Sequence, residues 1–181
     1  MSNIIQIEDF KGFHYIAVNP NCANMLQEYI DKYEDYYLCL LMGDTLKDDF
    51  IDDLSNGVPQ SQPYIDLYNK FCIEDIIFCR FYHMLYDHDV SKIISEGLKN
   101  ALLGLVYYHF VTNNQYKNTL VGLVENSNEN SKNLSPINVT MYADKRWNNA
   151  VQSFNAIAYK IYTEDLYKYP TALEEKYLDI I

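Results

Sequence analysis

Two long stretches with helical apolar periodicity, separated by a polar segment, constrain the fold of this chain most. The first, residues 95–113, carries apolar side chains on two opposite faces, so little of it is left for water. The second, residues 135–162, has one apolar stripe opposite a polar face. The stripe of the second stretch consists of Val139, Ala143, Trp147, Ala150, Phe154, Ile157 and Ile161. The pattern predicts two long helices packed against each other.

The segment between these stretches is asparagine-rich and polar, with one short apolar run at residues 120–124. A connection of about 19 residues is longer than most links between helices, and links of that length are commonly functional or disordered. We therefore expect residues 115–134 to form a projecting arm that presents a contact surface rather than an active site. The sequence leaves open whether the apolar run forms a hairpin or stays irregular.

The N-terminal half is expected to add shorter elements to the same domain. Residues 1–18 are predicted to be an extended arm or a short strand. A helix follows Pro20 and is expected to end at Gly43, because glycine is the usual residue just past a helix C-terminus. A second, shorter amphipathic helix then carries Leu46, Phe50 and Leu54.

Beyond a turn at Ser55-Asn56-Gly57, a short helix is predicted over residues 64–71. Residues 73–86 keep helical spacing, although their β-branched and aromatic content is also compatible with a strand. Ser95 is expected to cap the first long helix.

The last part of the chain is read as a tail on a single helical domain. In residues 166–181, a last helix is possible beside Pro170, and it would use Leu166, Tyr169 and Leu173. The fold class expected for residues 1–181 is a mainly α helical bundle. Its core spans residues 19–165, and its two long C-terminal helices are joined by an extended loop or β-hairpin arm.

Composition excludes several classes of protein. An apolar fraction of 49% in 181 residues excludes a disordered chain and suits one domain. A net charge of −11 argues against a surface made for nucleic-acid phosphate or for anionic membranes. No apolar run is long enough to span a bilayer, and the N-terminus lacks the features of a signal peptide.

Motifs that carry chemistry are largely missing. The chain has no phosphate-binding glycine loop and no nucleophile or zinc-protease signature, so we expect no enzyme and no cofactor. The four cysteines are expected to be free thiols in the core, among them Cys72 and Cys79. The aspartates at 48, 49, 52 and 53 are interpreted as a solvated acidic face. The best metal hypothesis is Cys79, His83 and Asp87, one helical turn apart.

Several short motifs stand in a particular order along the chain. They are Ser-Glu-Gly-Leu-Lys at 95–99, Tyr-Tyr at 107–108, Tyr-Lys-Asn-Thr at 116–119, Val-Gly-Leu-Val at 121–124, Asn-Glu-Asn-Ser at 128–131 and Met-Tyr-Ala-Asp-Lys-Arg-Trp-Asn-Asn at 141–149. Upstream stand Met25–Tyr33 and Leu40–Gly43. Together they resemble the head–tail connector (neck ring) proteins of tailed bacteriophages, including crAss-like phages of Bacteroidales. The resemblance covers about residues 20–165.

This resemblance implies a structural virion protein without catalytic activity. Such connectors are mainly helical and assemble as rings of about twelve subunits beneath the portal. They dock the portal and adjacent neck or tail rings, and DNA passes through the bore without specific binding. The implied location is the virion neck, after assembly in the host cytoplasm. The partner contacts implied on the arm are Tyr116, Asn118, Glu125, Asn128, Glu129 and Asn130.

Two other classes of function remain compatible with the sequence. One is a small helical metal-binding protein or enzyme that uses Cys79, His83 and Asp87. The other is a regulatory or adaptor protein unrelated to virions. Bound metal would favour the first of these, whereas ring formation would favour the connector.

Overall fold

The structure is a computed structural model of the chain, and most of what it describes is α-helical, as the sequence predicts. It describes residues 4–17, 20–75, 79, 92–114, 116–119, 122–125, 136–167 and 170–174. Within these ranges there are four α-helices, two short 3-10 helices and three two-stranded antiparallel pairs.

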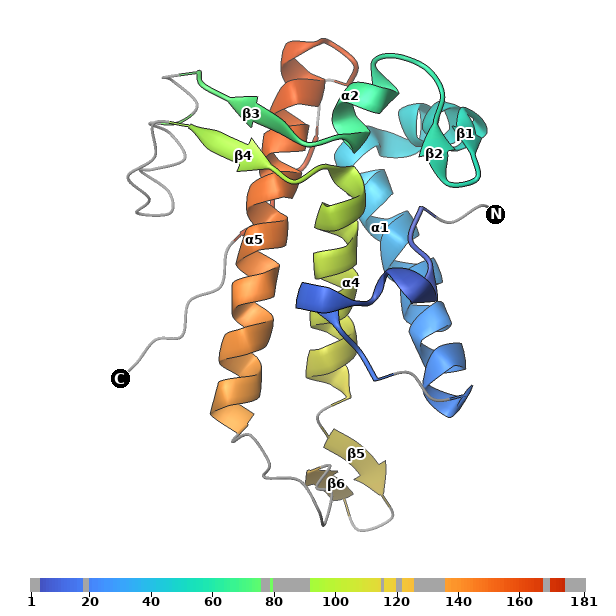
Figure 1. The fold of residues 1–181 in the computed structure, drawn as a ribbon, viewed down its shortest axis with the longest axis vertical. Coiled ribbons are helices and arrows are strands. Elements are labelled where there is room, and N and C mark those ends of the chain that lie inside the picture. The colour runs from blue at the N-terminus through green and yellow to red at the C-terminus, as the bar shows by residue number, and fades with distance from the viewer. Residues whose placement is uncertain are drawn as a thin grey trace.

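Three long helices run side by side along the molecule, with α4 in the middle (Figure 1). They are α1 (Pro20–Asp52), α4 (Leu98–Asn113) and α5 (Pro136–Thr163). The core lies between them, and α4 contributes side chains from both of its faces, as its two-sided apolar pattern predicts. The buried residues of α4 are Leu98, Ala101, Leu102, Leu103, Gly104, Leu105, Val106 and Phe110.

Helices α4 and α5 approach closely at Gly104. A Cβ atom built on Gly104 would lie 2.7 Å from the Cβ of Ala150 and 3.3 Å from Nε2 of His14. Only glycine leaves room there for both α5 and the chain around His14. The close contact between α4 and α5 therefore depends on glycine at position 104.

Helix α1 is interrupted where the sequence predicts a helix end. Gly43 has φ 66° and ψ 176°, which is outside the helical region, so two helices meet there at a kink. The ring of Tyr167 packs directly against Gly43. A Cβ atom built on Gly43 would lie only 2.8 Å from this ring, so a larger residue would displace it. The kink thus accommodates the chain that follows α5.

The chain between α1 and α4 forms short strands and one short helix. Strand β1 (Leu54–Ser55) pairs with β2 (Val58–Pro59) across the predicted turn. Helix α2 (Tyr64–Tyr68) is shorter than the predicted helix over 64–71, because Phe71 begins a strand.

That strand, β3 (Phe71–Ile73), pairs with β4 (Ile93–Ser95), with Phe71 opposite Ser95. The prediction that Ser95 caps α4 is wrong, since Ser95 is a fully buried strand residue. Gly97, with φ 88°, turns the chain from β4 into α4. The prediction failed because the β-branched pair Ile93–Ile94 favours pairing with β3.

Residues 4–17 correct the prediction of an extended N-terminal arm. They form two 3-10 helices, η1 (Ile7–Asp9) and η2 (Gly12–His14), and no strand. Ile4, Ile5 and Phe10 are buried in the main core. We call residues 4–17 the N-terminal segment. Its apolar residues are spaced so that a turning chain can bury them against α1 and α4.

Residues 170–174, which we call the C-terminal segment, correct the prediction of a last helix beside Pro170. Neither this segment nor residues 164–167 is helical, and Tyr169 lies outside the described residues. Leu173 packs against the main core. The buried amide of Asn155 accepts a hydrogen bond from the Leu173 N–H (2.8 Å) and donates one to its carbonyl oxygen (2.9 Å). This tertiary contact holds the segment against α5.

Candidate functional site

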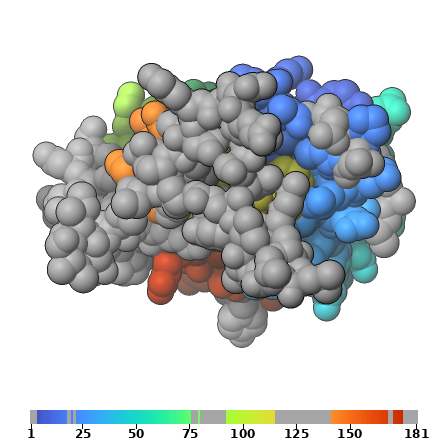
Figure 2. Space-filling view, turned by 90° about the horizontal axis from the view of Figure 1, so that it is seen from below, coloured from blue at the N-terminus to red at the C-terminus, as the bar shows by residue number. Residues whose placement is uncertain are grey.

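A β-hairpin lies beyond the ends of the long helices, in the segment predicted to be an arm. Strands β5 (Tyr116–Thr119) and β6 (Gly122–Glu125) pair antiparallel, and Figure 1 shows them below α4 and α5. Seen from that end, the N-terminal segment and the start of α1 lie on one side of the molecule and α5 on the other (Figure 2). Among the described residues, the two strands contact each other, and neither makes an extensive contact with any further element.

Three of the six predicted contact residues lie on this hairpin. Tyr116 and Glu125 are opposite each other in the register, and Asn118 pairs with Leu123. Asn128, Glu129 and Asn130 lie outside the described residues. The structure therefore brings two of the predicted residues, nine positions apart, to the same place.

The alternative metal hypothesis gains little from Cys79. Its thiol is buried and donates to the carbonyl oxygen of Ile73 (3.7 Å), and burial raises the pKa of this thiol. Burial among apolar side chains is the ordinary environment of a free cysteine in a core. His83 and Asp87 lie outside the described residues, and within those described no three His, Cys, Asp or Glu side chains converge to hold a metal.

The other cysteines correct one sequence prediction. All four thiols are free, as expected, but Cys72 is exposed rather than in the core. Strand β3 alternates, so Phe71 and Ile73 face inward while Cys72 faces solvent. The prediction treated all four free thiols as core groups, and it is wrong for Cys72 because the alternation of β3 turns this side chain to solvent.

His109 lies in an aromatic cluster between α1 and α4. Its ring stacks on Tyr33 with centroids 3.9 Å apart, and its Nε2 is hydrogen-bonded to the hydroxyl of Tyr37 (2.6 Å). Burial raises the pKa of the Tyr37 hydroxyl above its ordinary value. The stacking and the hydrogen bond join α1 to α4 through Tyr33, Tyr37 and His109.

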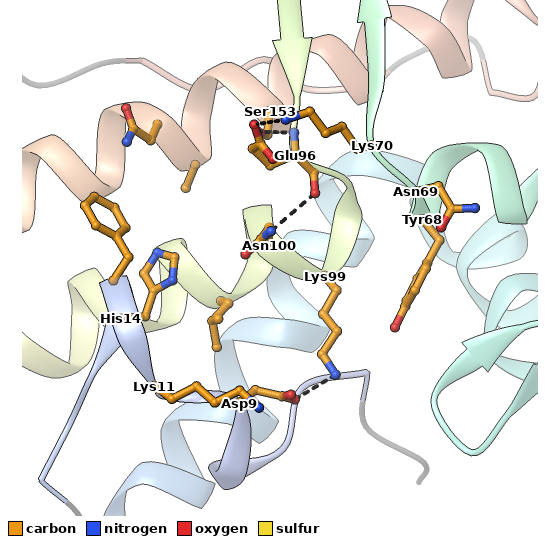
Figure 3. A pocket seen from close by; sticks show the side chains of 14 residues that line it. Asp9, Lys11, His14, Tyr68, Asn69, Lys70, Glu96, Lys99, Asn100 and Ser153 are labelled. Atoms are coloured by element: carbon orange, nitrogen blue, oxygen red, sulfur yellow. Dashed lines mark hydrogen bonds and ion pairs between the residues drawn. The ribbon is translucent and has the colours of Figure 1, made fainter.

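A pocket that the sequence did not predict lies beside the first turns of α4 (Figure 3). Its volume is about 610 Å³, within the range of small-molecule sites. Four separate parts of the chain line it, including the N-terminal segment and both long C-terminal helices. The lining residues are Asp9, Lys11, Phe13, His14, Tyr68, Asn69, Lys70, Glu96, Lys99, Asn100, Leu103, Asn149, Ala150 and Ser153.

Two ion pairs stand at different parts of the pocket rim. Lys99 pairs with Asp9 (2.8 Å) beside the N-terminal segment, and Lys70 pairs with Glu96 (2.7 Å) near β3 and β4. His14 forms part of the wall, and its burial, with the nearby charge of Arg146, lowers the pKa of the imidazole to about 4. The histidine is therefore neutral at physiological pH, and the lysines carry the positive charge of the site.

The wall formed by the N-terminal segment is anchored by a buried carboxylate. Glu34 is 7% exposed, and its side chain accepts hydrogen bonds from the backbone N–H groups of Ile4 (3.1 Å) and Ile5 (2.9 Å). Burial raises the pKa of Glu34 to about 7, although the two hydrogen bonds and Lys99 oppose the effect; Asp31 adds to it. At the other end of the segment, Arg146 donates from Nε to the Phe13 carbonyl oxygen (2.6 Å).

The fold and these sites define a small helical-bundle protein that carries a polar pocket and a terminal hairpin. The chain belongs to the DUF6712 family, a family of unknown function, whose model matches residues 22–174. No curated protein and no solved structure is significantly similar to it. Of the helices described, none has the length and apolar character needed to cross a membrane.

Proposed function

We propose that this protein is a structural virion protein: a ring-forming head–tail connector that docks beneath the portal and extends the DNA channel. In this proposal the two long C-terminal helices hold residues 115–134 as a projecting hairpin arm. Tyr116, Asn118, Glu125, Asn128, Glu129 and Asn130 contact neighbouring subunits, the portal or adjacent rings. The protein acts in the virion neck and catalyses no reaction.

The β5–β6 hairpin is the observation that carries this proposal. Its strands pair with each other beyond the ends of α4 and α5. An isolated two-stranded hairpin is marginally stable in water, so it gains stability when a partner covers it. A small bundle that places such a hairpin away from its own core suits assembly with other chains. The resemblance of residues 20–165 to neck proteins supplies the kind of assembly.

The net charge of −11 also supports a channel protein. An acidic bore repels the phosphate backbone, so DNA can slide during packaging and ejection without being held. A ring with a basic or neutral bore would contradict this part of the proposal.

A photo-crosslinking experiment tests the role of the hairpin. Replacing Tyr116 with p-benzoylphenylalanine should give crosslinks to a second subunit, or to the portal protein when the two are co-expressed. The same replacement at Tyr162, which is 61% exposed on α5, provides the matched control and should give fewer crosslinks. Equal crosslinking at both positions would argue against a contact surface on the hairpin.

Electron microscopy of the full chain mixed with portal protein tests the assembly itself. Rings stacked beneath the portal are expected. A chain that stays monomeric both alone and with the portal would overturn the connector proposal. The position of the gene, between those for portal and tail proteins, would be an independent check.

A further inference from the structure

The pocket beside the first turns of α4 reverses the charge balance of the chain. Acidic residues outnumber lysine and arginine by 25 to 14 in the whole sequence. In the pocket, three lysines face two carboxylates, those of Asp9 and Glu96. Arg146 lies next to this lining, with its guanidinium 4.5 Å from the ring centroid of Phe13. Lys99 and Lys70 are paired with these carboxylates, so the lining carries one excess positive charge in an otherwise acidic protein, which favours an anionic occupant.

The lower rim in Figure 3 is the best place for the anionic group. Lys11 and Lys99 both reach toward Asp9 there, and Asp9 is bonded to the Lys99 ammonium. The carboxylate of Asp9 also accepts the backbone N–H of Gln6 (2.8 Å). Asp9 therefore occupies a position where the Lys99 ammonium can serve an anion, with Lys11 on the same part of the lining.

A group that replaces Asp9 on the lysines must attract them more strongly than a carboxylate does. A phosphate monoester carries up to two negative charges and three acceptor oxygens, whereas a carboxylate carries one charge and two oxygens. Lysine binds phosphate as a point charge and needs no planar geometry for it. The chemistry of the rim therefore favours a phosphate group.

The rest of the lining suits the body of a small polar molecule. Asn69, Asn100 and Asn149 supply donors and acceptors, and Tyr68 and Leu103 supply apolar surface. A volume of about 610 Å³ is far larger than a single phosphate ion needs and matches a phosphorylated metabolite. The size and the amides thus extend the requirement from an anion to an organic phosphate.

We propose that the pocket binds a small phosphorylated molecule, whose phosphate group contacts Lys11 and Lys99 in place of the Asp9 carboxylate. The body of the ligand lies along α4 toward Asn100 and Asn69. This binding activity is separate from the role in virion assembly, so each of the two proposals can fail without the other.

Isothermal titration in phosphate-free buffer at low salt tests this site with two pairs of probes. They are glucose 6-phosphate with glucose, and adenosine 5′-monophosphate with adenosine. The phosphorylated member of at least one pair should bind, and its unphosphorylated partner should not. If neither phosphorylated probe binds up to ~10 mM, the proposal is overturned. Binding of poly-glutamate without binding of either phosphate would also overturn it, because it would assign the pocket to acidic proteins.

Substitutions that remove a positive or a negative charge test where the phosphate group binds. Lys99→Gln and Lys11→Gln should each weaken binding by roughly tenfold, since each removes a charge-assisted contact. Asp9→Asn should strengthen binding several-fold, because it removes the competing carboxylate while an amide oxygen can still accept from Gln6. Lys145→Gln, an exposed lysine elsewhere on α5, is the matched control and should change nothing.

Lys11 is exposed, so the Lys11→Gln variant keeps the test valid if loss of Lys99 loosens the N-terminal segment. Equal affinities in all four variants, or weaker binding in Asp9→Asn, would show that the phosphate does not sit at this rim and would overturn the assignment.

Discussion

The N-terminal and C-terminal segments both lie across the helices, but they are attached by different kinds of group. The N-terminal segment is held by ionisable side chains: Glu34 binds its first residues, and the Asp9–Lys99 pair holds its middle. The C-terminal segment is held by neutral groups. The Asn155 amide bonds Leu173 twice, and the Trp147 indole donates to the Glu174 carbonyl oxygen (2.8 Å).

This difference predicts that the two attachments respond to different conditions. A contact through a buried carboxylate changes with pH, and an exposed ion pair weakens with salt. A contact through amide and indole groups does neither. The wall of the pocket nearest Lys99 is therefore adjustable by pH and salt, while the attachment of the C-terminal segment to α5 is not.

The largest expected effect concerns Glu34. The folded protein binds a proton at Glu34 with a pKa of about 7, whereas the unfolded chain does so near 4.5. The stabilisation from this carboxyl is therefore complete below pH 4.5 and is lost as the pH rises through 7. At about 1.4 kcal/mol per pH unit, the loss amounts to roughly 3 kcal/mol. The difference in free energy of unfolding between wild type and Glu34→Gln, measured by urea denaturation from pH 4 to 8, should fall by this amount.

Glu8→Gln is the matched control for this experiment, since Glu8 is an exposed glutamate on the same segment. It should change the free energy of unfolding by less than ~0.5 kcal/mol. A difference between wild type and Glu34→Gln that stays constant with pH would contradict the buried-carboxylate account of the N-terminal attachment.

The second largest effect is expected from a substitution that removes the attachment of the C-terminal segment. Asn155→Ala removes two buried hydrogen bonds and leaves both backbone groups of Leu173 without that partner. We expect a loss of about 2 kcal/mol in the free energy of unfolding, with no dependence on pH between 5 and 8. The emission of Trp147, the single tryptophan, should shift to longer wavelength as its contact with Glu174 loosens.

Asn149→Ala on the same helix provides the comparison for that variant, because Asn149 is exposed. It should leave both the stability and the Trp147 emission nearly unchanged. If the Asn155→Ala loss varied with pH as strongly as the Glu34→Gln difference, the contrast between the two segments would be wrong.

The smallest effect has the opposite sign of pH dependence and concerns His14. The pKa of this imidazole is lowered from 6.5 to about 4, so the folded protein binds its proton less readily than the unfolded chain does. Its stabilisation is present above pH 6.5 and is lost as the pH falls through 4. Because the ring is only partly buried, we expect about 1 kcal/mol. The difference between wild type and His14→Gln should therefore grow from pH 4 to 7.

This rise opposes the fall expected from Glu34, so the two groups partly cancel in the wild type between pH 4.5 and 6.5. Nuclear magnetic resonance titration of His14 gives the pKa directly. A value near 6.5 would remove the reason for the opposite slope.

Much of the fold follows from apolar spacing, and the errors occur where contacts distant in sequence decide. The two-sided apolar pattern of α4 and the break at Gly43 were predictable, because periodicity and glycine act locally. Ser95 and Cys72 were misassigned because the strand pairing of Phe71–Ile73 with Ile93–Ser95 spans residues that carry helical spacing. Pairing partners so far apart cannot be read from either strand alone.

The candidate sites divide in the same way. The hairpin lies within a continuous stretch, so the sequence identified the segment, although the pairing of Tyr116 with Glu125 needed the structure. The pocket could not be predicted, because Asp9, Lys70 and Lys99 come from separate parts of the chain and belong to no motif. Single lysines are ordinary surface residues until the fold brings them together.

The sequence by itself determined the long helices, the acidic surface and the polar stretch between α4 and α5, because side-chain spacing and charge are properties of a local segment. Only the tertiary structure decided that both terminal segments fold back onto the helices, and that one is held by charges and the other by amides. Those choices depend on burial, which changes the proton affinity of Glu34 and His14 and orders Asn155. Burial exists only once distant parts of the chain have packed together.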